Sequence, residues 1–118
     1  MMKDRTTQMA LVERVRDLLT DESVQREVSM FGGRSFMINE KLAVCAMKDG
    51  SLLVRVDPAQ HDQLLQREGA SQAEMGVGRD MGPGWLVASA AILERDSELA
   101  FWVETSLRHN RVLTGTSV

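Results

Sequence analysis

The chain has 118 residues, of which 43% are hydrophobic and 26% are charged, and its formal net charge is −3. This length and composition predict one globular domain that needs no disulfide or metal for stability. The single cysteine, Cys45, cannot form an internal disulfide, so we expect a reducing, cytoplasmic setting. The acidic balance argues against direct nucleic-acid binding, and the absence of a long apolar run argues against a membrane span.

The first element predicted is a helix over residues 6–20, whose large aliphatic side chains recur along one helical stripe. An irregular strand follows and ends at Met30. The adjacent glycines Gly32 and Gly33 then give the backbone the freedom to reverse direction. The stripe consists of Leu11, Val12, Val15, Leu18 and Leu19.

The next segments alternate strands and turns, which is typical of an antiparallel sheet. A strand over residues 36–38 leads to a hairpin turn at Asn39 and Glu40, where Asn tolerates a positive φ and Glu replaces the usual Gly. Residues 42–47 are apolar on both sides, which indicates a strand in the middle of a sheet or facing a subunit interface.

A second hairpin turn is predicted at Asp49-Gly50, before a strand over residues 52–56. In that strand Leu52, Val54 and Val56 share one face. Leu53 and Arg55 point to the other face, which we expect to be partly wet or paired.

The second half of the chain contains shorter elements. Asp57-Pro58 predicts the start of a helix that ends at Gly69. Residues 70–84 are predicted to be irregular, and residues 85–88 form a closing strand. The last helix begins near Asp96 or Ser97.

Together these elements predict an α+β fold with a two-layer antiparallel sheet, flanked by an N-terminal helix and C-terminal helices. They form a single domain over residues 1–113, followed by a flexible tail over residues 114–118.

Three arginines are the candidate binding residues: Arg34, Arg55 and Arg79. If the glycine-rich loops fold over the sheet, their guanidinium groups could converge on an anion or on a partner's carboxylate. The competing interpretation is that Arg55 pairs with an internal carboxylate such as Asp80 and orders the long loop. We favour it, because structural ion pairs are common.

The Gly76–Gly84 loop could also bring backbone N–H groups to an anion through Gly76, Gly78 and Gly82. Its spacing is not that of a phosphate-binding motif, and Pro83 stands where a helix should begin, so a flexible loop is the favoured interpretation.

A catalytic or metal centre is not expected. Cys45 lies in the middle of a predicted strand, where a small buried thiol is the usual outcome. The two histidines, His61 and His109, have no metal-ligand spacing with Cys45 or with each other, and both are expected at the surface. We therefore expect no cofactor, no metal and no enzymatic activity.

Several short segments, in this order and spacing, carry a resemblance to a known family. They are Met30-Phe31-Gly32-Gly33 with Phe36, Asn39 and Lys41, Leu52 to Val56, Gly78-Arg79-Asp80-Met81, Trp85-Leu86-Val87, and Leu99-Ala100 with Trp102-Val103. On these residues the chain resembles the amino-terminal domain of the TfoX/Sxy family of bacterial competence regulators. The resemblance implies a two-layer domain with an antiparallel sheet, often dimeric, and brings no catalytic residues with it. In longer members a second, helical domain follows, and they regulate uptake genes together with a global transcription activator.

The sequence thus predicts a non-catalytic regulatory or adaptor protein that acts through protein–protein contacts. We expect a homodimer, with a transcription factor or a separate helical-domain protein as further candidate partners. The alternative is a small-molecule or anion-binding module that uses Arg34, Arg55, Arg79 and the Gly76–Gly84 loop.

Overall fold

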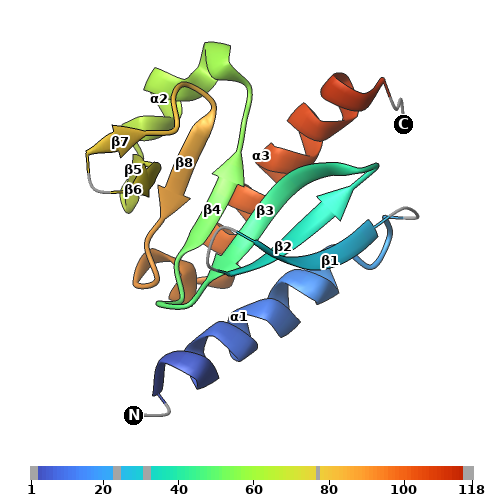
Figure 1. The fold of residues 1–118 in the computed structure, drawn as a ribbon, viewed down its shortest axis with the longest axis vertical. Coiled ribbons are helices and arrows are strands. Elements are labelled where there is room, and N and C mark those ends of the chain that lie inside the picture. Colours follow the sequence, from blue (N-terminus) through green and yellow to red (C-terminus); the bar gives the residue numbers. More distant parts are fainter. Residues whose placement is uncertain (1–2, 23–24, 31–32, 77, 116–118) are drawn as a thin grey trace.

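An antiparallel sheet forms the centre of the computed structural model, which describes residues 3–22, 25–30, 33–76 and 78–115 (Figure 1). The strands are β1 (Gln25–Met30), β2 (Gly33–Ile38), β3 (Lys41–Met47), β4 (Leu52–Arg55), β5 (Ala70–Gln72), β6 (Glu74–Gly76), β7 (Arg79–Asp80) and β8 (Trp85–Ala88). Six of them pair in the order β1-β2-β3-β4-β8-β5, while β6 and β7 form a separate hairpin.

The helical elements are α1 (Lys3–Leu18), η1 (Pro58–Gln60), α2 (His61–Leu65), η2 (Ile92–Glu94) and α3 (Asp96–Thr114). With an N-terminal helix, an antiparallel sheet and a C-terminal helix, the structure confirms the predicted α+β class. The helix predicted after Asp57-Pro58 is shorter than expected. The last helix begins at Asp96, as predicted, and extends to Thr114, where Gly115 caps it with a φ of 72°.

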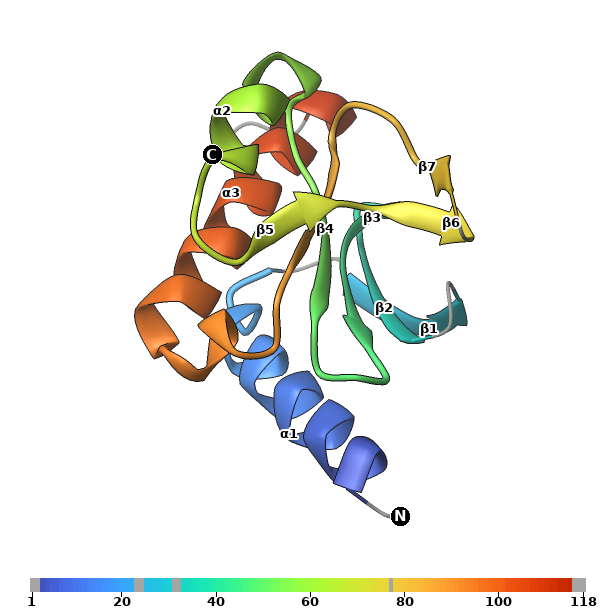
Figure 2. The ribbon, with the colours of Figure 1, turned by 90° about the vertical axis from the view of Figure 1, so that its left-hand side faces the viewer.

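Helices α1 and α3 pack on the same face of the sheet and bury its main core (Figure 2). Strand residues that alternate toward the helices, such as Phe36 and Val44, are fully buried, as is Trp102 on α3. The side-chain amide nitrogen of Asn110 donates to the carbonyl oxygen of Ile38 at 2.9 Å, which ties α3 to the end of β2. The helix stripe predicted for α1 supplies Leu11, Val12, Val15 and Leu19 to this core.

The prediction that residues 70–84 are irregular is wrong, because β5, β6 and β7 lie within that segment. Strand β5 pairs with β8, with Ala70 opposite Ala88, and extends the sheet beyond the strand that was expected to close it. These strands are only two or three residues long, so their backbone pairing depends on the neighbouring strand more than on local sequence pattern.

The turn predicted at Asn39 and Glu40 is confirmed, and both residues have positive φ, 52° and 67°. This conformation matches the twist of the flanking strands, but it is unfavourable for Glu40, which lacks the freedom of glycine. An ion pair between the side chains of Glu40 and Arg26, 2.8 Å long, connects this turn to β1.

At Gly33 the close approach of two strands requires a glycine, because an added Cβ would clash with the backbone carbonyl oxygen of Ala46 on β3. At Gly76, by contrast, the nearest atom to an added Cβ is a side-chain carbon of Arg79 at 4.0 Å. Gly33 is therefore constrained by packing, and Gly76 is not.

We predict that Gly33→Ala lowers the free energy of unfolding by about 1–3 kcal/mol, because a backbone atom must move to admit the methyl group. Gly76→Ala is the matched control and should change it by less than about 0.5 kcal/mol. Urea unfolding followed by circular dichroism measures both. Equal effects of the two substitutions would contradict the packing constraint at Gly33.

Candidate functional site

The side of the main sheet that faces away from α1 and α3 is termed the open face. On β4, Leu52 and Val54 belong to the core under the helices, while Leu53 belongs to a second cluster on the open face. No helix within the described residues packs on this side, where the β6–β7 hairpin lies instead (Figure 2). The second cluster consists of Leu42, Cys45, Leu53 and Ala73, with Met37, Met47, Met81, Trp85 and Val87 packed around them.

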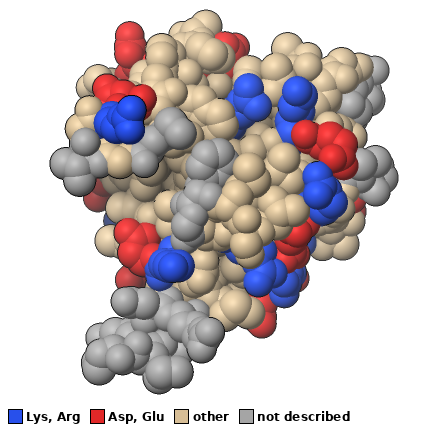
Figure 3. All heavy atoms as spheres, viewed as in Figure 1, with Lys and Arg blue, Asp and Glu red and all other residues tan. Residues whose placement is uncertain are grey.

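The open face has a buried centre and a partly exposed apolar margin. Cys45 and Leu53 are 0% and 2% exposed, whereas the surrounding methionines remain partly accessible. Viewed from this side, the described atoms at the centre of the molecule are uncharged, and charged side chains lie around them (Figure 3). Methionine side chains are flexible and polarisable, so such a margin can adapt to the shape of a partner.

The thiol of Cys45 is a poor nucleophile in this position. Burial raises its pKa above the usual value, and a hydrogen bond with Ser35 offsets part of that rise. The thiolate, which is the reactive form, is thus disfavoured at neutral pH. This placement confirms the prediction of a small buried cysteine.

Arg55 lies at the margin of the open face, beside Trp85. The two residues are directly opposite each other on β4 and β8, and the guanidinium carbon lies 5.1 Å from the centroid of the indole ring. This distance is typical of a cation–π interaction. The structure therefore gives Arg55 an aromatic neighbour, and Asp80, the carboxylate considered above, has no ion pair with it among the described residues.

The three predicted arginines do not surround one site. Arg34 on β2 faces the helix side, where its Nη1 atom donates to Glu27 at 3.0 Å, and Glu27 also accepts from Arg16 on α1 at 2.6 Å. Arg55 lies on the opposite face of the sheet, and Arg79 is exposed on β7.

The predicted glycines have separate structural roles. Gly78 and Gly82 have φ values of 75° and 94°, and no atom lies within 4 Å of a Cβ added at either position. Their backbone conformation, not close packing, favours glycine there. Gly32 lies outside the described residues.

His61 is a structural residue that the sequence did not reveal, and the prediction that it lies at the surface is wrong, because it is only 6% exposed. Its Nδ1 atom accepts from the backbone N–H of Gly84 at 2.9 Å, so Nε2 carries the proton and donates to Gln72 Oε1 at 2.8 Å. The amide nitrogen of Gln72 donates to the carbonyl oxygens of Gly82 and Trp85, both at 3.2 Å. This network holds the segment that leads into Trp85.

Within the described part of the chain, no group of three His, Cys, Asp or Glu side chains is placed to share a metal ion. Nor do the described helices include one with the length and apolar character needed to cross a membrane.

A family model described as TfoX N-terminal domain matches residues 17–110, which is most of the chain. The matched region includes every strand of the main sheet, α2 and most of α3. Comparison with curated proteins and with solved structures gives no match.

We predict that His61→Leu lowers the free energy of unfolding by about 1–3 kcal/mol, because it leaves the N–H of Gly84 and the amide oxygen of Gln72 without these partners. His109→Leu is the control, since His109 is only partly buried, and it should change stability by less than about 0.5 kcal/mol. Thermal or urea unfolding measures both variants. A stable His61→Leu protein would show that the network does not hold the fold.

The charge of Arg55 also provides a test of the arrangement at the margin of the open face. Burial lowers the pKa of His109, repulsion from Arg55 lowers it further, and attraction to Asp57 opposes both effects. Arg55→Gln should therefore raise the pKa of His109 toward its usual value, because one repulsive charge is removed. NMR titration of the His109 ring measures this shift. Arg79→Gln, which changes an exposed arginine on β7, should leave the pKa unchanged.

Proposed function

The chain belongs to the TfoX N-terminal domain family, and we propose that it is a non-catalytic regulatory or adaptor protein that acts through protein–protein contacts. The association of this family with competence regulation supports a role in the control of transcription or competence. A cytoplasmic location is part of the proposal, supported by the free and buried Cys45.

The open face is the observation that carries this proposal. Its margin exposes apolar side chains of three methionines, Trp85 and Val87 around a buried apolar centre. Aromatic residues and methionine are enriched in protein interfaces, and a contiguous apolar area on a sheet is stabilised when a partner removes it from water.

A second copy of the chain is the first partner we propose for this surface. A two-fold dimer places the same patch of both subunits in contact, so an apolar margin meets an apolar margin. In such an arrangement Arg55 remains at the edge, where it keeps its contact with Trp85 and some access to solvent.

Further partners would be a transcription factor or a separate helical-domain protein. The net charge of −3 favours a protein partner over direct nucleic-acid contact, because phosphate binding needs a concentrated positive surface.

We predict a dimer that a single charge on the open face disrupts. Met47→Lys and Val87→Lys should each shift the protein toward the monomer, because a buried unpaired ammonium group is costly in an interface. Val112→Lys is the control, since Val112 is 81% exposed on α3. Sedimentation velocity over a range of concentrations measures the distribution, and circular dichroism checks the fold.

A monomeric wild type at all concentrations would contradict the dimer. The adaptor role has its own test, which is native co-purification from the source cell after nuclease treatment. Recovery of a stoichiometric regulatory protein with the wild type, and its loss with Val87→Lys, is the expected result. Tight binding to a random DNA duplex at low salt would contradict an adaptor that acts through protein contacts alone.

A further inference from the structure

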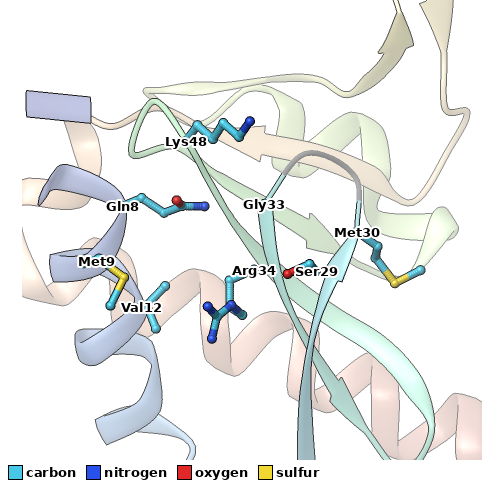
Figure 4. Close-up of a pocket in the computed structure, with 8 residues that line it drawn as sticks. All are labelled: Gln8, Met9, Val12, Ser29, Met30, Gly33, Arg34 and Lys48. Carbon is cyan, nitrogen blue, oxygen red and sulfur yellow. The ribbon is translucent and has the colours of Figure 1, made fainter. Parts of the chain in front are cut away.

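A cleft of about 370 Å³ lies between α1 and the β1–β2 hairpin, on the helix side of the sheet (Figure 4). Gln8, Met9 and Val12 line it from α1, and Lys48 lines it from the turn after β3. The hairpin contributes Ser29, Met30, Gly33 and Arg34. The cleft therefore lies on the opposite side of the sheet from the open face.

The walls of the cleft are held in place by contacts between the elements. The side-chain amide nitrogen of Gln8 donates to the carbonyl oxygen of Ala46 at 3.0 Å, which fixes α1 against β3. Gly33 lies against the same carbonyl group, where an added Cβ would clash, so β2 also packs closely on β3 at this point. Val12 is 1% exposed and belongs to the main core.

Among the described residues that line the cleft, the two charged ones, Arg34 and Lys48, are both positive. Arg34 directs its guanidinium group from β2 toward Val12 on α1 (Figure 4). Its carboxylate partner, Glu27, lies outside the cleft lining and is shared with Arg16, so Arg34 retains donor capacity. Lys48 is exposed and has no ion pair among the described residues. In a chain with a net charge of −3, this local positive potential favours an anionic ligand.

The cleft also exposes apolar surface. Met9 on α1 is 41% exposed, which makes it one of the most accessible large hydrophobic residues of the described chain. Met30 contributes to the wall of the cleft from β1, but its side chain points away from α1 (Figure 4). A ligand that covers Met9 removes apolar area from water. The cleft therefore combines a cationic part with an apolar part.

We propose that this cleft binds a small amphipathic carboxylate. The apolar chain of the ligand packs on Met9 beside Val12, and its carboxylate accepts from Arg34, with Lys48 adding favourable charge. Since a water molecule occupies about 30 Å³, a cleft of about 370 Å³ holds roughly a dozen non-hydrogen atoms. A medium-chain carboxylate such as octanoate has this size, and it is the probe we choose.

The test is an NMR titration of the full-length, nitrogen-15-labelled protein with sodium octanoate. Saturable shifts in the backbone signals of Gly33, Arg34 and Lys48 are expected. Octanol, which has the same chain without the charge, should bind at least tenfold more weakly, because it cannot form the charge-assisted hydrogen bond. Octylamine, which has the opposite charge, should produce no saturable shifts at these residues.

Two substitutions measure separately how much each positive charge of the cleft contributes to octanoate binding. Arg34→Gln should raise the dissociation constant for octanoate about tenfold, and Lys48→Gln should raise it about two- to fivefold. Arg26→Gln is the matched control, since Arg26 is an exposed arginine on the same hairpin that does not line the cleft, and it should leave the constant unchanged.

Equal affinity for octanoate and octanol would overturn the proposal, as would the absence of saturable shifts at millimolar octanoate. An equal loss of affinity in Arg26→Gln and Arg34→Gln would do the same. These outcomes do not depend on whether the protein forms a dimer. Met47, the site of the dimer-disrupting Met47→Lys substitution, does not line the cleft.

Discussion

The burial of β3 on both faces is the constraint on which the rest of the structure depends. Leu42 to Ala46 are all buried, so each side of this strand needs apolar cover. On the helix side, α1 and α3 supply it. On the other side, the methionines, Trp85 and the β6–β7 hairpin cover Cys45 and Leu53 but remain partly exposed themselves. The open face is thus a consequence of a central strand whose two sides receive unequal cover.

The sequence predicted the parts of the fold whose signals are local. The turn at Asn39 and Glu40, the two-sided burial of β3 and the start of α3 follow from residue types at fixed spacing. The His61–Gln72 contact could not be predicted, because it joins residues whose spacing carries no motif and whose pairing arises only when α2 packs against β5. Strands β5 to β7 were missed for the same reason, since tertiary pairing defines them.

The sequence pattern already indicated that Arg34 and Arg55 lie on opposite faces of the sheet. Side chains alternate along a strand, so Arg34 shares a face with Phe36, and Arg55 shares a face with Leu53. Once Phe36 and Leu53 are assigned to opposite faces, the two arginines cannot meet. The convergence hypothesis assumed that loops could bring them together, but both residues lie on strands whose register fixes their direction.

The same alternation assigns a different role to each residue from Gly33 to Phe36. Gly33 permits the close approach to β3, Arg34 points to the cleft, and Phe36 enters the main core. Ser35, on the opposite side, is buried and donates to the carbonyl oxygen of Met30 at 3.4 Å. Four neighbouring residues thus contribute in turn to four different features. Gly33 permits close backbone packing, Arg34 lines the cleft, Ser35 lies on the open face, and Phe36 belongs to the main core. A shift of register by one residue would exchange the polar and apolar sides of the strand, so these residue types must occur in this order.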